Sequence, residues 1–141
     1  MNVNECKIFP EVICSLKNLN TLSLMANELN SLPPEVGQLR NLESLNLDFN
    51  NFTTFPAVLL KLTKLTTLLM LDNFLETLPA GINQLSQLKS LILADNQKME
   101  IPEEILELEN LEKLDINPNF DPENERTKYK GKSDVRNALI I

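Results

Sequence analysis

Asparagine recurs every 23 residues along most of this 141-residue chain, and this repeat constrains the fold more than any other feature. The series consists of Asn4, Asn27, Asn50, Asn73, Asn96 and Asn119. Prolines keep the same period, at Pro10, Pro33, Pro56, Pro79 and Pro102. Three leucine series do so too; they begin at Leu16, Leu19 and Leu22 and end at Leu108, Leu111 and Leu114. Agreement between independent series predicts an array of equivalent, stacked units.

The spacing of apolar residues changes within each unit. Leu45-Asn46-Leu47 alternates with a period of two, which is typical of a strand. Pro33, Val36 and Leu39 follow at steps of three, which favours a short helical turn opened by proline. No unit can bury its leucines alone, so we expect parallel stacking, with neighbouring strands about 4.8 Å apart around one continuous core.

The asparagine series has a physical explanation. Where each strand turns inward, backbone N–H and C=O groups face the interior, and an unsatisfied one costs about 1–3 kcal/mol. A carboxamide both donates and accepts hydrogen bonds, whereas a carboxylate only accepts. We therefore expect stacked asparagine side chains to satisfy the turns of their own and neighbouring units.

These units resemble the leucine-rich-repeat consensus LxxLxxLxLxxNxLxxLP. Residues 39–56 match it, and residues 62–79 match it again. The 23-residue length and the LPxxI/V turn, as in residues 32–36 and 78–82, resemble the intracellular "Ras-group" class and its bacterial relatives. The resemblance implies an α/β fold: a right-handed, arc-shaped solenoid with a parallel sheet on the concave face and short 3-10 or α turns on the convex face. It also implies protein binding through that sheet.

The repeat predicts the domain organisation. Residues 1–120 are expected to form the solenoid, with a partial first repeat, four full repeats and a partial last repeat. Residues 121–141 are expected to form a C-terminal cap with a short helix that begins after Ser133. Cys6 falls at a core position, and the first strand, with Leu22 and Leu24, is expected to be a thinly covered edge. Lys98 replaces an apolar residue of the repeat, and we expect a local shift that lets Met99 fill the gap.

The residues between the strand leucines are expected on the concave face, where several are apolar beside aspartates. The candidate partner-binding residues are Met25, Asp48, Phe49, Leu69, Leu71, Asp72, Phe74, Ile92 and Asp95. An apolar centre with a polar rim is typical of a protein interface. The alternatives are self-association through the same patch, or outer leucines that are simply tolerated. Asp72 and Asp95 on adjacent strands repel each other; solvated carboxylates are the simpler interpretation, because two aspartates do not supply the oxygens of a cation site.

Composition argues against an enzyme. The chain has no histidine, so histidine-based triads and metal clusters are excluded, and its three glycines form no phosphate-binding loop. Cys14 has no histidine to activate it. We therefore expect no catalytic residues, no metal and no cofactor.

Charge and targeting signals bear on partners and location. The net charge of −7 disfavours nucleic acid and anionic membranes. No signal sequence is recognisable, and two free thiols in a reducing compartment are the simpler interpretation of the cysteines. We expect a cytoplasmic interaction module, such as a signalling adaptor or regulator, with a protein partner. The alternatives are a secreted or surface bacterial protein whose signal was removed, and a self-associating structural protein, dimeric through the concave patch or the N-terminal edge strand.

Overall fold

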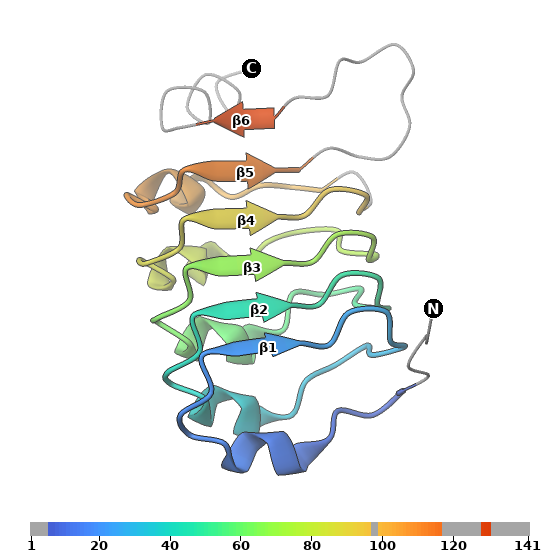
Figure 1. Cartoon of the computed structure of the whole chain (residues 1–141). Coiled ribbons are helices and arrows are strands. Elements are labelled where there is room, and N and C mark those ends of the chain that lie inside the picture. Colours follow the sequence, from blue (N-terminus) through green and yellow to red (C-terminus); the bar gives the residue numbers. More distant parts are fainter. Residues whose placement is uncertain (1–5, 97–98, 117–127, 131–141) are drawn as a thin grey trace.

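The computed structural model describes residues 6–96 and 99–116, together with the backbone of 128–130 (Figure 1). Each repeat contributes one short strand and one 3-10 helix. The strands are β1 (Thr21–Ser23), β2 (Ser44–Asn46), β3 (Thr67–Leu69), β4 (Ser90–Ile92), β5 (Lys113–Asp115) and β6 (Lys128–Lys130). The 3-10 helices are η1 (Glu11–Ser15), η2 (Pro34–Gln38), η3 (Ala57–Lys61), η4 (Ala80–Gln84) and η5 (Glu103–Glu107).

The strands form one sheet in chain order, with a register fixed by the repeat. Strands β1 to β5 are parallel, and each residue pairs with the residue 23 positions later: Leu22 with Leu45, Leu45 with Leu68, and so on. Figure 1 shows the sheet on one side and the 3-10 helices behind it. The expected leucine-rich-repeat solenoid, with strands on one face and short helical turns on the other, is therefore confirmed.

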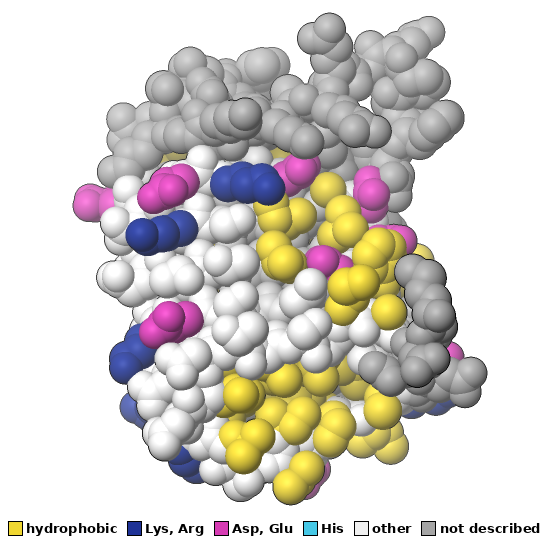
Figure 2. Space-filling model, viewed as in Figure 1, with side chains coloured by type: hydrophobic (Ala, Val, Ile, Leu, Met, Phe, Trp, Pro, Cys, Tyr) yellow, Lys and Arg dark blue, Asp and Glu magenta, His cyan; other side chains and the backbone are white. Residues whose placement is uncertain are grey.

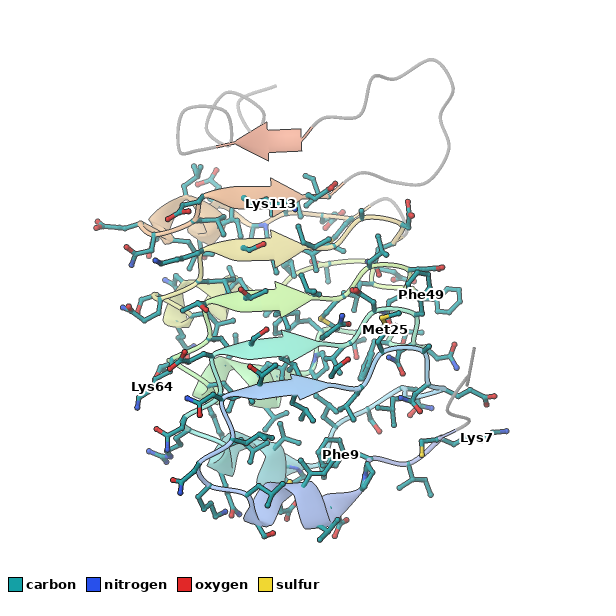
Figure 3. All side chains as sticks on the ribbon, viewed as in Figure 1. Lys7, Phe9, Met25, Phe49, Lys64 and Lys113 are labelled. Atoms are coloured by element: carbon teal, nitrogen blue, oxygen red, sulfur yellow. The ribbon has the colours of Figure 1, made fainter. Side chains whose placement is uncertain are left out.

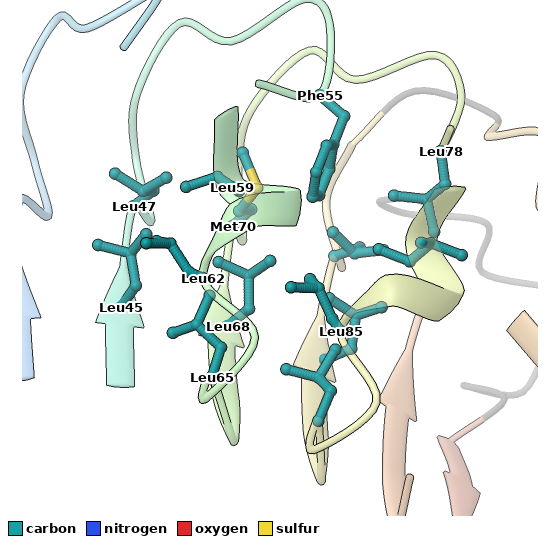
Figure 4. Close-up of a cluster of buried hydrophobic side chains, with 14 of the residues drawn as sticks. Leu45, Leu47, Phe55, Leu59, Leu62, Leu65, Leu68, Met70, Leu78 and Leu85 are labelled. Atoms are coloured by element: carbon teal, nitrogen blue, oxygen red, sulfur yellow. The ribbon is translucent and has the colours of Figure 1, made fainter. Parts of the chain in front are cut away.

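The leucine series form the core between the sheet and the helices (Figure 4). Leu39, Leu62 and Leu85, which end the helical segments, are fully buried, as are the strand residues Leu68 and Leu91. The proline of each unit lies immediately before its 3-10 helix, where its carbonyl accepts the first helical N–H, as in Val36 N to Pro33 O (3.1 Å). Because proline lacks an N–H, this position leaves no donor of its own unsatisfied.

The asparagines satisfy the interior of the turns, as expected. Asn50 is buried; its Nδ2 donates to Leu24 O and Leu47 O (both 3.0 Å), and its Oδ1 accepts from Leu29 N–H (3.0 Å). Asn73 and Asn96 repeat this pattern one and two coils later. Each asparagine thus joins its own turn to the preceding coil, which fixes the spacing and register of the stack.

One expectation needs correction, one is confirmed, and four concern residues outside the described ones. Cys6 is exposed rather than buried, and among the described residues no coil packs over it; Cys14, on η1, is the buried cysteine. Met99 packs half-buried against the core, as expected. Asn4, Lys98, Asn119 and the helix after Ser133 lie outside the described residues.

The end of the sheet carries a strand that we did not predict. β6 pairs antiparallel with β5, with Leu114 opposite Tyr129. It comes from a polar stretch with no apolar alternation, so periodicity gave no signal for it. The domain boundary near residue 120 and the capping role of 121–141 stay predictions.

Candidate functional site

The sheet face presents a polar half and an apolar half. At the start of the strands the outward-facing residues are small and hydroxylated: Thr21, Ser44, Thr67 and Ser90. At the ends of β3 and β4, Leu69 and Ile92 are opposite each other and half-buried. The side chains that favour contact with an apolar partner therefore lie toward the carboxyl ends of the strands.

The turns after the strands extend this apolar area. Phe49 N–H donates to Leu71 O (2.8 Å), which places the turns of the second and third coils side by side. Met25, Phe49 and Phe74, from three successive coils, each leave 41–46% of their surface exposed. Figure 3 shows Met25 and Phe49 at the same edge of the sheet, beyond the ends of the strands. We define the concave patch by the residues Met25, Phe49, Leu69, Leu71, Phe74 and Ile92; Figure 2 shows hydrophobic side chains gathered in this region.

Four residues at equivalent turn positions adopt a left-handed backbone. The φ angles are 57° at Ala26, 56° at Phe49, 51° at Asp72 and 60° at Asp95. Aspartate and asparagine tolerate this region because their short side chains hydrogen-bond locally, whereas for most other non-glycine residues it costs about 1–2 kcal/mol. Phe49 is therefore a bulky, exposed aromatic residue in an unfavourable conformation. The sequence pattern predicts that Phe49 is exposed but not that its backbone is left-handed. The aspartates at the equivalent positions 72 and 95 are the signal for that conformation.

Asp48 does not belong to the accessible surface, contrary to our expectation. Only 8% of its surface is exposed, and its Oδ1 accepts a hydrogen bond from Leu71 N–H (2.7 Å) in the next coil. Burial raises the pKa of Asp48, and the hydrogen bonds with Leu71 and Asn46 offset only part of this rise. Asp48 therefore supports the turn beneath the concave patch and has little surface to offer a partner.

The other two predicted aspartates border the patch. Asp72 is exposed, Asp95 is half-buried, and they occupy equivalent positions of adjacent coils. Within residues 6–96 and 99–116, no group of three or more acidic, cysteine or histidine side chains is arranged to hold a metal ion. Their position gives the patch an acidic border.

The chain belongs to the leucine-rich-repeat family: the profile described as "Leucine-rich repeat region" matches residues 2–133. Among solved structures, a leucine-rich-repeat protein of Leptospira interrogans is 36% identical, with a TM-score of 0.62, over 84% of this chain and 36% of that one. The ectodomain of the Arabidopsis thaliana receptor kinase GASSHO1/SCHENGEN3, in complex with CASPARIAN STRIP INTEGRITY FACTOR 2, is 33% identical (TM-score 0.67; 77% and 14% covered). An internalin of Listeria monocytogenes is 26% identical (TM-score 0.66; 78% and 32% covered). No curated protein matches the sequence significantly.

The solved structures also bear on the share of their length that this chain spans and on its cellular location. The chain spans between 14% and 36% of the length of these three proteins. Because they include the ectodomain of a membrane receptor, they do not support the cytoplasmic location that we expected, and they are compatible with the secreted or surface alternative. No helix in the described parts of the chain has the length and apolar character needed to cross a membrane.

Proposed function

We propose that this chain is a non-enzymatic binding module that captures a protein or peptide segment on the concave patch. The segment presents apolar side chains to Phe49, Leu69 and Ile92, and basic side chains to the acidic border at Asp72 and Asp95. Apolar centres with charged rims are typical of specific protein interfaces, and complementary rim charges speed association.

The conformation of Phe49 carries this proposal. The next two coils have an aspartate, Asp72 and Asp95, at the position equivalent to Phe49. An aspartate at position 49 would relieve the backbone strain and remove an exposed aromatic ring. Residues held in disfavoured backbone regions cluster at functional sites, and aromatic residues dominate binding hot spots. Phe49 is therefore best explained as an anchor for a partner.

The relatives support the same class of function. The Arabidopsis ectodomain, which is 33% identical to this chain over the matched region, was solved in complex with CASPARIAN STRIP INTEGRITY FACTOR 2. We extend this binding role to the present chain, together with a secreted or surface location. A role as an intracellular signalling adaptor is the competing version, and detection of the chain in culture supernatant or in the cytosolic fraction separates the two.

A double variant, Phe49→Asn with Phe74→Asn, tests the proposal. Asparagine suits the left-handed turn at position 49 and is already present at Asn51, the position equivalent to Phe74. The variant should therefore fold normally and lose partner capture in a pull-down followed by mass spectrometry. The matched control is Ala26→Asn, which places asparagine at the equivalent left-handed position one coil earlier. This variant should still capture the partner. Equal capture by wild type and the double variant would remove the concave patch from the function.

A further inference from the structure

Four positively charged side chains gather at the edge of the sheet where the strands begin. We define the basic cluster by Lys17, Arg40, Lys61 and Lys64, which are all exposed and come from three successive coils. They are four of the seven lysine and arginine side chains that the structure describes, in a chain of net charge −7. Figure 3 shows Lys64 at this edge, on the side opposite Phe49, and Figure 2 shows basic side chains along the same edge.

Hydrogen bonds with uncharged groups direct two of these side chains onto the second coil. Lys17, from the first coil, donates through Nζ to Gln38 Oε1. Lys64, from the third coil, donates through Nζ to Asn41 Oδ1 (2.8 Å), and Asn41 Nδ2 in turn donates to Lys17 O (2.9 Å). Since Arg40 lies between Gln38 and Asn41 in the second coil, the charges of three coils are held close together.

The fourth side chain, Lys61, also extends over the second coil. Its stem passes so close to Gly37 that a β-carbon at position 37 would lie 2.8 Å from the Lys61 Cδ. The missing side chain of Gly37 thus leaves room for the lysine stem, whose charged end stays in water. Among the described side chains, none of the four cations has a carboxylate within 4.0 Å, whereas Lys7 forms an ion pair with Glu28 elsewhere. The basic cluster is therefore not neutralised within the described part of the chain.

The sign of the charge changes further along the same edge. In the first three coils, the segments between the last helical residue and the strand contain the four cations and one carboxylate, that of Glu43. The equivalent segment of the fifth coil contains no cation and three carboxylates, those of Glu107, Glu109 and Glu112. With about 4.8 Å between coils, the basic cluster extends about 10 Å along the stack. A short run of negative charges fits this length, whereas a long polyanion would continue onto the acidic coil and be repelled.

We propose that the basic cluster binds an acidic segment, a short run of aspartate or glutamate residues, of the protein that the concave patch captures. The inference rests on the proposed function and adds a second contact to it. The sheet then has cations where its strands begin and aspartates, Asp72 and Asp95, where they end. Exposed complementary charges chiefly speed association and fix orientation. The basic cluster therefore sets the direction in which the partner crosses the sheet.

Titration of the ¹⁵N-labelled full chain with hexaglutamate, followed by amide chemical shifts, tests this site without the partner. At about 20 mM salt the largest shifts should fall on residues 17, 38–41 and 61–64, and binding should weaken at about 150 mM salt. Arg40→Gln with Lys64→Gln should raise the half-saturating concentration about fivefold, because two exposed charge contacts are lost. The control, Lys7→Gln with Lys113→Gln, removes the same charge outside the cluster and should bind like wild type. All four side chains are exposed, so circular dichroism should show an unchanged fold.

Several outcomes of the titration would overturn the proposal. They are an absence of binding at low salt, shifts centred on other residues, and equal binding by the two variants. Heparin or duplex DNA that binds more tightly than hexaglutamate at about 150 mM salt would assign the cluster to a long polyanion instead.

The pull-down of the proposed function supplies the link to the partner. Arg40→Gln with Lys64→Gln should recover less of the partner than the Lys7 and Lys113 control, and equal recovery would show that the partner does not use the basic cluster. The titration contains no partner, so it is independent of the concave patch. If hexaglutamate binds the cluster but Phe49→Asn with Phe74→Asn captures the partner as wild type does, the proposed function alone has failed.

Discussion

Replacing Asn73 with alanine removes four hydrogen bonds from the middle of the stack. The Asn73 Nδ2 donates to the carbonyl oxygens of Leu47, Met70 and Leu71 (3.0, 3.2 and 3.2 Å), and its Oδ1 accepts from Phe52 N–H (3.1 Å). The carbonyls do not become unsatisfied. Leu47 O still accepts from the Asn50 amide, Met70 O from the Asn96 amide, and Leu71 O from a backbone N–H. Phe52 N–H is the group that loses its partner.

The expected cost follows from this difference. An orphaned, buried N–H costs about 1–3 kcal/mol, and each of the lost secondary bonds contributes a fraction of about 0.5–1.5 kcal/mol. We therefore expect Asn73→Ala to lower the free energy of unfolding by about 2–5 kcal/mol, a large part of the stability of a small domain. Asn27→Ala is the matched control: Asn27 is half-exposed, so water replaces its bonds, and the expected loss is about 1 kcal/mol or less.

Urea denaturation followed by far-ultraviolet circular dichroism measures both losses, since the chain has no tryptophan for fluorescence. With a slope of about 2 kcal/mol per molar urea, the midpoint of Asn73→Ala should fall by about 1–2.5 M. Asn73→Leu separates hydrogen bonding from packing, because it fills the space without donating or accepting. If leucine restores the wild-type midpoint, the asparagine series acts by filling volume and the reasoning is refuted.

Three further predictions concern ionisation, backbone strain and thiol access. A carboxyl group whose pKa is raised in the folded state makes the stability fall as the pH rises through that pKa. The side chain of Asp48→Asn can still accept the Leu71 N–H hydrogen bond but carries no charge. This variant should therefore be more stable than wild type near pH 7 and lose that advantage below about pH 4. A difference that is constant with pH would contradict this. Ala26→Asn should raise the free energy of unfolding by about 0.5–1 kcal/mol in urea titrations because it relieves the left-handed turn, and a loss of stability would contradict the strain. A thiol reagent should label Cys6 rapidly in the native protein but Cys14 only after unfolding. Burial first, and next the charge of Glu35, raise the pKa of Cys14, so little reactive thiolate forms there. Simultaneous labelling of the two cysteines would contradict the burial of Cys14.

The repeat predicted the stack because its periodic residues all face inward. Leu45, Leu68 and Leu91 have equivalent neighbours above and below, so period alone determined their burial. The same reasoning failed for Cys6, whose position in the repeat is a core position but which no coil of the described residues covers. Burial in a solenoid thus depends on the neighbouring coil as well as on the position within the unit.

The concave patch was predicted in part. Leu69, Leu71 and Ile92 lie where the strand alternation put them, half-buried on the sheet face. Asp48 does not, because its carboxylate folds back to a backbone N–H of the next coil, a contact that no alternation pattern encodes. The strand β6 was not predicted because it pairs with the outer edge of β5 through its backbone and has no apolar pattern of its own.

Site-specific photocrosslinking tests the central claim, that the sheet face of the stack holds a partner, most directly. A benzophenone side chain at position 74 lies in the concave patch, and one at position 57 lies at the start of η3 on the opposite side. In an extract of the source cells, position 74 should give a protein adduct that unlabelled wild type competes away, and position 57 should give none. Adducts from position 57 with none from position 74 would contradict the account.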